Sequence, residues 1–212
     1  MKKQHLRILG LAMGVLVSQS VFSADTGFYA DIGVGQSKAD LNASSGFTVD
    51  DTDTSYSIGV GYNVNKYISV EGGYLKLGKA KLSTSGTVSG TYYGAPFSAT
   101  GTLNASAEVD GFYLGPVVRL PVSDKFEVFG RAGAYFWNLD TVASASGSLT
   151  YAGTVYAGGV TAKATKDGTD AYYGVGANYK LNDRVSVGLD WTRFDIDGTD
   201  VDNIGARVKV SF

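Results

Sequence analysis

The sequence predicts an all-β fold, an eight-stranded antiparallel up-and-down transmembrane β-barrel. Three observations predict it. First, apolar residues alternate with small or polar residues over eight segments, which is the period of a strand with two unlike faces. Second, no stretch after residue 24 reaches the ~18 consecutive apolar residues of a spanning helix. Third, short and long connections between the segments alternate strictly. The barrel therefore has short periplasmic turns at one end and long extracellular hairpin loops at the other.

The chain begins with an expected secretory signal peptide, residues 1–23, which leaves residues 24–212 as the barrel domain. Three basic residues, Lys2, Lys3 and Arg7, precede a short apolar run at 8–17. Val21 and Ser23 suit cleavage before Ala24. Cleavage after Ala24 is the alternative, and it would place bulky Phe22 three residues before the cut.

Composition excludes several kinds of function. Residues 1–23 hold three of the 18 Lys and Arg residues and none of the 20 Asp and Glu residues, so residues 24–212 carry 15 positive and 20 negative side chains, a net charge of −5. That balance argues against a nucleic-acid partner. The expected mature chain has no His and no Cys. It therefore lacks the usual ligands of zinc, haem and transition metals, and the partners of a Ser-His or Cys-His nucleophile. We expect no cofactor, no disulfide and no catalysis.

The eight segments follow one another in a simple order. They cover roughly residues 27–37, 54–63, 67–78, 105–120, 126–140, 170–181, 185–195 and 201–212. Three connections are tight, at 64–66, 121–125 and 181–184, and they contain the Asn, Asp and Pro residues that short turns favour. The other four are longer, at 38–53, 79–104, 141–169 and roughly 196–200.

The two faces of these segments differ in a way that indicates lipid outside the barrel. One face carries Val, Ile, Leu and Ala, and aromatic residues stand near the segment ends. The other face is rich in Gly and Ser with a few charges of both signs. A narrow interior needs small residues and paired charges, whereas a water-exposed face has no use for so many glycines. Two aromatic girdles are typical of membrane interfaces. They comprise Tyr62, Tyr67, Phe126, Tyr179 and Phe212 beside the tight turns, and Tyr74, Phe136, Tyr173 and Trp191 toward the long loops.

Four stretches carry a family resemblance: ADTGFYADIGVG (24–35), GYNVNKYISVEGGY (61–74), YLGPVVRLPVSDKFEVFGRAGAY (113–135) and ARVKVSF (206–212). Together they resemble the outer-membrane β-barrel family typified by the OmpA transmembrane domain and OmpX. The resemblance covers nearly all of residues 24–212. It implies a place in the cell outer membrane after Sec-type export and signal cleavage, in contact with outer-membrane lipid and lipopolysaccharide.

The same resemblance implies a role for the C-terminus. In that family, the barrel-assembly machinery recognises a C-terminal Phe with alternate apolar residues before it. Phe212, Val210 and Val208 match that pattern here. The chain ends at the barrel, so wall anchoring by a peptidoglycan-binding domain is not implied. The expected state is a monomer.

Charged residues on the interior face form the first candidate site. Glu71, Arg131, Asp190 and Arg207 each lie about four or five residues from the tight-turn rim, and Glu127 and Lys209 share their face. We expect these six to form a lumen charge layer. A plug of ion pairs and a gated narrow pore for ions or small solutes are both open, and an enzyme using carboxylates is a more distant alternative. An eight-stranded interior is just wide enough to be filled by side chains.

The two longest loops form the second candidate site. They are rich in Ser, Thr, Ala and Gly and nearly uncharged in the middle. We expect hairpins that continue the barrel strands, with tip aromatics that suit contacts. OmpX-like relatives are associated with surface adhesion, and inert loops are the alternative. The candidate contact residues are Tyr92, Tyr93 and Phe97 of the first hairpin, and Tyr151 and Tyr156 of the second.

Two smaller sites complete the set. Lys76 and Arg193 point outward just past Tyr74 and Trp191, where they suit lipopolysaccharide phosphates or ordinary snorkelling. The acids at 50–53 lack the glycine-turned spacing of a calcium loop, so a solvated acidic loop is expected there and no metal.

Overall fold

The computed structural model describes residues 26–40 and 48–212. The expected signal peptide and its cleavage site lie outside these residues. No helix in the described part of the chain has the length and apolar character needed to cross a membrane.

The described residues form nine strands. They are β1 (Gly27–Ala39), β2 (Thr48–Asp50), β3 (Thr52–Asn63), β4 (Ile68–Tyr92), β5 (Ala95–Pro121), β6 (Phe126–Tyr151), β7 (Thr154–Lys180), β8 (Val185–Ile196) and β9 (Thr199–Ser211). Eight of them match the predicted segments. β2 was not predicted, and it pairs only with residues 81–83 of β4.

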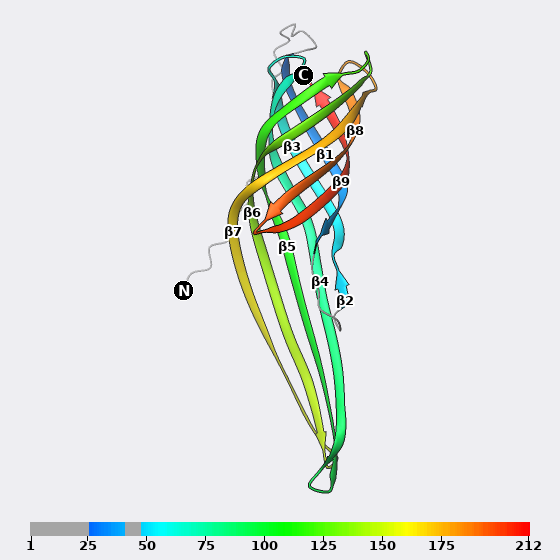
Figure 1. The fold of residues 1–212 in the computed structure, drawn as a ribbon, viewed down its shortest axis with the longest axis vertical. Helices are drawn as coiled ribbons and strands as arrows, with labels where there is room; N and C mark the ends of the chain where they lie inside the picture. Colours follow the sequence, from blue (N-terminus) through cyan, green and yellow to red (C-terminus); the bar gives the residue numbers. More distant parts are fainter. Residues whose placement is uncertain (1–25, 41–47) are drawn as a thin grey trace.

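Eight antiparallel strands close into a ring in chain order, which confirms the predicted fold class. With β2 set aside, each strand pairs with its neighbours in the sequence, and β1 pairs with β9 to close the ring. The tight turns and the C-terminus lie at one end of the barrel, and four strands run far beyond the other end (Figure 1).

The two faces of the barrel wall are oriented as predicted. Leu189 and Ile204 point outward and are 66% and 65% exposed, whereas Asp31 and Glu71 point inward and are 3% exposed. The exposed apolar surface is what lipid requires, since closed strand pairing leaves no backbone polar group unsatisfied.

The interior contains more than the small residues and charges that the sequence predicted. A cluster of large apolar side chains fills its half nearer the long loops: Leu75, Leu77, Tyr113, Tyr135, Trp137, Tyr172, Phe194, Ile196 and Val201. All are 7% exposed or less. Tyr172 stacks on Phe194 at 5.6 Å between ring centroids. The expectation of an interior without bulky apolar residues was therefore wrong in this half. Tyr113, Tyr135 and Tyr172 are flanked by apolar residues on both sides, which hides the alternation at these positions.

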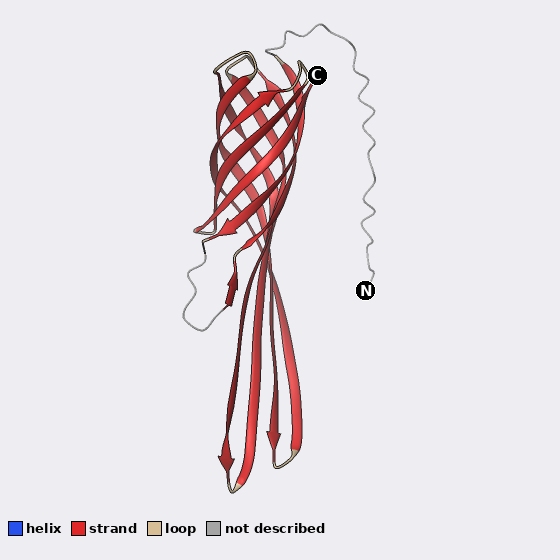
Figure 2. Ribbon diagram, turned by 90° about the vertical axis from the view of Figure 1, so that its right-hand side faces the viewer, coloured by secondary structure: helices blue, strands red, loops and turns tan. Residues whose placement is uncertain are grey.

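Beyond the barrel, β4, β5, β6 and β7 continue as one four-stranded sheet, which we call the protruding sheet (Figure 2). Its two hairpins end in two-residue turns, Tyr93-Gly94 and Ala152-Gly153, in which all four residues have positive φ. Such turns match the twist of paired strands and fix their register. The predicted continuation of the barrel strands into hairpins is confirmed.

A bulge in β4 marks where the protruding sheet leaves the barrel. The register between β4 and β5 shifts between Lys76 and Gly78, and Gly78 has a φ of 92°. The shift reverses which residues of β4 face inward: Leu75 and Leu77 do so before it, and the even-numbered residues do so after it.

Candidate functional site

Four of the six predicted lumen residues form a closed set of ion pairs in the middle of the barrel. Arg131 lies 3.3 Å from Glu71 and 2.5 Å from Asp190, and Arg207 lies 3.4 Å from Glu71 and 3.1 Å from Asp190. Each guanidinium thus bridges the same two carboxylates, which come from β4 and β8. We call these four residues the central layer.

A third carboxylate and several hydroxyl groups surround the central layer. Asp31 of β1 is buried, and its nearest cation is Arg207 at 4.0 Å. Among the described residues, neither carboxylate oxygen of Asp31 has a hydrogen-bond partner, and the hydroxyls of Tyr113 and Tyr172 have none either. Tyr29 donates a 2.9 Å hydrogen bond to Glu71. The central layer and Asp31 together therefore combine three carboxylates with two guanidinium groups.

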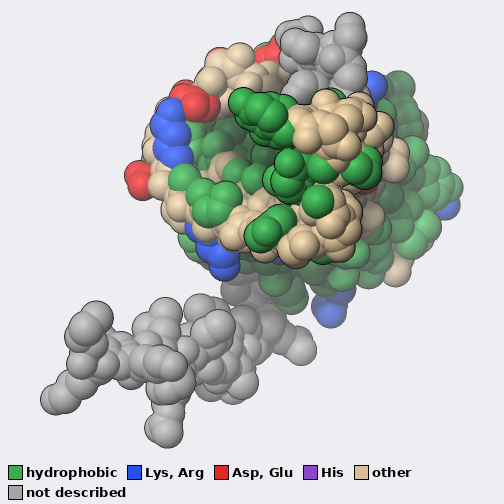
Figure 3. Space-filling model, turned by 90° about the horizontal axis from the view of Figure 1, so that it is seen from below, with side chains coloured by type: hydrophobic (Ala, Val, Ile, Leu, Met, Phe, Trp, Pro, Cys, Tyr) green, Lys and Arg blue, Asp and Glu red, His purple; other side chains and the backbone are tan. Residues whose placement is uncertain are grey.

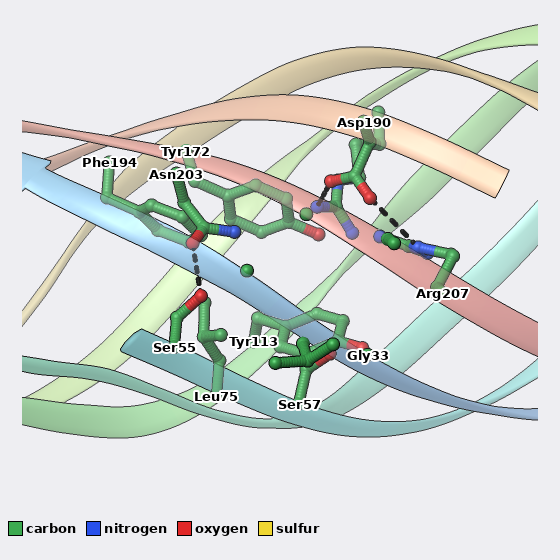
Figure 4. Close-up of a pocket in the computed structure, with 15 residues that line it drawn as sticks. Gly33, Ser55, Ser57, Leu75, Tyr113, Tyr172, Asp190, Phe194, Asn203 and Arg207 are labelled. Atoms are coloured by element: carbon green, nitrogen blue, oxygen red, sulfur yellow. Dashed lines mark hydrogen bonds and ion pairs between the residues drawn. The ribbon is translucent and has the colours of Figure 1, made fainter. Parts of the chain in front are cut away.

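A small cavity lies beside the central layer (Figure 4). Its volume is about 20 Å³, and Arg131, Asp190, Arg207, Tyr113 and Tyr172 are among its lining residues. That volume holds about one water molecule, and the unpaired hydroxyls of Tyr113 and Tyr172 are hydrogen-bonding groups for such a water. On the far side of the cavity, Ser55 donates a 2.5 Å hydrogen bond to Asn203. Side chains therefore fill the lumen at this level.

The other two predicted lumen residues form a separate group nearer the tight turns. Lys209 lies 3.1 Å from Glu127, and Asn178 donates a 2.8 Å hydrogen bond to the same carboxylate. Arg119 lies 4.0 Å from Glu127 and also donates to the backbone oxygen of Asn65. Arg119 was not among the predicted lumen residues, although its position between outward Val118 and Leu120 indicates an inward side chain.

The two outward cations are already paired with carboxylates. Lys76 contacts Glu108, and Lys79 lies 3.0 Å from the same carboxylate. These lysines hold the pKa of Glu108 below its ordinary value, Lys76 through the stronger hydrogen bond. Arg193 binds Asp202 at 2.7 Å and Asp200 at 3.1 Å. Its hydrogen bond lowers the pKa of Asp202. Contact of either cation with lipopolysaccharide therefore competes with these pairs.

The acidic loop residues accept hydrogen bonds from nearby backbone and hydroxyl groups. Asp53 accepts the backbone N–H of Thr54 and of Lys79, both at 2.8 Å. Asp51 accepts a 3.0 Å hydrogen bond from the hydroxyl of Thr52. Over residues 26–40 and 48–212, no three acidic or histidine side chains are grouped to hold a metal ion.

The protruding sheet has two unlike faces. The face that continues the lumen surface, here called the inner face, is apolar, and the opposite outer face consists largely of Ser and Thr. The inner face comprises Ala80, Leu82, Thr84, Gly86, Val88, Gly90 and Tyr92 of β4; Ala95, Phe97, Ala99, Gly101, Leu103, Ala105 and Ala107 of β5; Thr141, Ala143, Ala145, Gly147, Leu149 and Tyr151 of β6; and Thr154, Tyr156, Gly158, Val160 and Ala162 of β7.

Several large side chains of the inner face are exposed, whereas Leu82, Phe97 and Tyr151 are half-buried. Val88 is 65% exposed, Val160 68% and Tyr156 61%. On the outer face, hydroxyls pair across strands, and the Thr87 and Thr100 hydroxyl oxygens are 3.1 Å apart. An exposed, contiguous apolar sheet face indicates a contact surface.

The structure brings the five predicted loop residues to the end of the protruding sheet. Tyr92 and Tyr93 contact each other with ring centroids 4.6 Å apart, and Tyr92 lies 6.5 Å from Tyr151. Phe97 is the register partner of Tyr151. Tyr156 lies two register pairs further from the turn of its hairpin than Tyr151, and its register partner is Leu149.

An apolar pocket lies where the protruding sheet meets the barrel mouth. It has a volume of about 180 Å³ and walls that include Leu77, Val109, Leu139, Ile196 and Val201. From the hairpin end, hydrophobic side chains gather inside the ring of the molecule, with charged side chains on the rim (Figure 3). The pocket and the inner face therefore form one continuous apolar surface.

The C-terminal residues lie on the outside of the barrel at the tight-turn end. Phe212 is 58% exposed, and its backbone N–H donates to Phe28 of β1 at 2.9 Å. Val208 and Val210 point outward on the same strand.

Comparison with known proteins identifies one matching family and several solved structures to which the chain is similar. The sequence profile of the family described as "Outer membrane protein beta-barrel domain" matches residues 9–212. The chain is similar in fold to Ail, the attachment invasion locus protein of Yersinia pestis, in complex with the heparin analogue sucrose octasulfate, with 14% identity, a TM-score of 0.47, and 89% of this chain and 99% of that one covered. It is also similar to the N-terminal β-barrel domain of Pseudomonas aeruginosa OprF, with 10% identity, a TM-score of 0.45, and 88% and 99% covered. No curated protein matches the sequence.

Proposed function

Because this chain belongs to the outer membrane protein β-barrel family and lies in the cell outer membrane, we propose that it is a structural and surface-interaction protein that makes its contacts through the protruding sheet. One observation carries the proposal: four strands extend about 40 Å past the barrel, from the level of Ala80 to Tyr92, and leave a wide apolar face exposed. No catalytic step is part of the proposal.

The lumen supports a structural role for the barrel. Every charge of the central layer faces an opposite charge, and the adjoining cavity has room for about one water molecule. Buried charges that are paired in this way plug an eight-stranded barrel rather than line a passage.

Surface contact is tested by shortening both hairpins at register partners. An Asn-Gly turn replaces residues 86–101, joining Ser85 to Thr102, and a second replaces 147–158, joining Ser146 to Gly159. We expect the variant to insert normally, while proteoliposomes carrying it lose adhesion to polystyrene beads. Adhesion equal to that of the natural protein would overturn the proposal.

A narrow pore is the second candidate, because the cavity beside Arg131 and the unpaired Tyr113 and Tyr172 hydroxyls leave polar space in the lumen. Planar-bilayer recording separates the two functions. A plugged lumen gives no discrete conductance steps. A pore gives steps, and Glu71→Ala and Arg131→Ala change their size.

Two further contacts belong to the proposal. Lys76 and Arg193 stay partly exposed within their ion pairs, with side chains 46% and 33% exposed, which leaves N–H groups for lipopolysaccharide phosphates. Outward Phe212, Val210 and Val208 form an accessible signal for the barrel-assembly machinery.

A further inference from the structure

A row of four glycines crosses the protruding sheet at mid-length. Gly86 pairs with Gly101, Gly101 with Gly147, and Gly147 with Gly158, so the row spans all four strands on the inner face. No side chain projects from the row. It divides the inner face into a half near the barrel and a half near the hairpin tips.

The two halves are complementary in size. On each strand, a residue beyond the row corresponds to one at the same distance before it. Tyr92 corresponds to Ala80, Phe97 to Ala105, and Tyr151 to Ala143. At two other positions the larger residue lies on the barrel side of the row: Leu82 corresponds to Gly90, and Leu103 corresponds to Ala99. Leu149 corresponds to Ala145. Four correspondences do not join a large residue to a small one: Val88 with Thr84, Ala95 with Ala107, Thr154 with Ala162, and Tyr156 with Val160, which are both bulky.

This pattern fits a second inner face turned end over end. A two-fold axis along the glycine row lays each strand antiparallel over its own copy, so a large side chain meets a small one at the six complementary correspondences. Sheets that pack face to face lie about 10 Å apart and need such interdigitation. The barrel lumen lies on the inner-face side, and β1, β3, β8 and β9 stand there. Two chains in one membrane therefore cannot face each other without their barrels overlapping. Chains in two opposed membranes can.

The size of the inner face suits a stable pair. Four strands spaced about 4.8 Å apart and about 40 Å long offer roughly 760 Å² per chain, or roughly 1,500 Å² for both. Specific interfaces bury about 1,200–2,000 Å² in total. In this arrangement, the aromatic tip of each sheet also reaches the apolar pocket at the mouth of the other barrel, whose walls include Leu77 and Val109.

We propose that the inner face binds a second copy of this chain on an opposed membrane, through a two-fold axis along Gly86, Gly101, Gly147 and Gly158. The proposal rests on the proposed function and names its partner: the surface contacted is another membrane that carries the same protein.

Vesicle clustering tests the proposal with matched charge substitutions. The natural protein, purified from outer membranes and reconstituted in liposomes, is expected to cluster vesicles by light scattering. Leu103→Glu with Leu149→Glu places two charges in the interface and is expected to reduce the clustering rate at least tenfold. Thr102→Glu with Ser148→Glu adds the same charge to the adjacent outer-face positions and leaves clustering intact. Absence of clustering by the natural protein, or equal clustering by both variants, overturns the proposal.

Cross-linking tests the position of the axis. The chain contains no cysteine, and a Cβ at Gly101 meets no atom within 4 Å. Gly101→Cys is therefore expected to cross-link to its own copy through a short bis-maleimide, and mixing two differently tagged vesicle populations is expected to give cross-linked pairs that carry both tags. Thr102→Cys on the outer face is the control. Equal cross-linking by the control, or cross-linking within one dilute population of unclustered vesicles, contradicts the two-fold arrangement.

The failure of this inference is distinguishable from failure of the proposed function. If the shortened hairpins abolish adhesion to polystyrene while the inner-face glutamates leave vesicle clustering unchanged, only self-recognition fails. If the shortened hairpins change neither adhesion nor clustering, both fail.

Discussion

Replacing Arg131 by Met tests whether the central layer holds the barrel together. Arg131 contacts Glu71, Asp190 and, through a 3.1 Å hydrogen bond, the hydroxyl of Thr192. Its removal leaves Asp31, Glu71 and Asp190 buried with Arg207 as the one remaining guanidinium, so the net charge of the group changes from −1 to −2. Breaking a buried ion pair by removing one partner costs about 3–5 kcal/mol, and we expect a loss of that size.

The assay is the free energy of unfolding by urea in lipid vesicles, followed by tryptophan fluorescence. Arg193→Met is the matched control, because it removes the same charge from an exposed pair with Asp200 and Asp202 and should cost clearly less. Arg131→Met combined with Asp190→Asn restores the net charge of −1 and should recover part of the loss. Equal losses for Arg131→Met and Arg193→Met would refute the reasoning, since they would mean that the central layer is as well solvated as the rim.

Three other outcomes are expected. The pKa of Glu108 is lowered in the folded state, so its ion pairs stabilise that state fully above about pH 4.5, the ordinary pKa of the group. This contribution is lost as pH falls through the lower folded pKa. The difference between the unfolding midpoints at pH 7 and pH 3 should therefore be smaller in Glu108→Gln than in the natural protein. A Cβ at Gly59 would collide with the Tyr113 hydroxyl and lie 2.7 Å from Asp31, so Gly59→Ala should cost about 1–3 kcal/mol by overpacking. Gly86→Ala, where a Cβ meets nothing within 4 Å, serves as the control, and equal losses would contradict the packing. Phe212→Ala should lower the amount of folded protein in the outer membrane of cells without changing refolding of the purified chain in detergent, and unchanged membrane levels would contradict the assembly role.

Alternation alone was enough to predict the strands and their two faces. Lipid-facing positions such as Ile32 and Leu189 are apolar, while Glu71 and Asp190 alternate with them, so a period of two residues separates the faces without knowledge of strand pairing. Arg131 and Arg207 lie at similar numbers of residues from the tight-turn rim. Because up-and-down strands all start from that rim, the sequence predicted that these two residues lie at the same level of the barrel.

Features that depend on register could not be predicted in the same way. The glycine row exists only because three strand pairings align residues 86, 101, 147 and 158, and the bulge at Gly78 is needed to bring Gly86 onto the inner face. The inner aromatic cluster was missed because Tyr113 and Tyr135 have apolar neighbours on both sides, which removes the contrast between faces.

The pairing of β1 with β9 has a kinetic consequence. The β4–β5 and β6–β7 hairpins close through two-residue turns, so their loop-closure entropy is minimal and hairpins of this kind form within microseconds. The seam that joins Tyr29 to Ser211 connects opposite ends of the chain and carries the largest closure cost. We therefore expect the seam to form last. Until the seam forms, β9 is a free edge strand. The C-terminal segment that ends in Phe212 therefore stays accessible, during the slowest step of folding, to a factor that binds the open sheet.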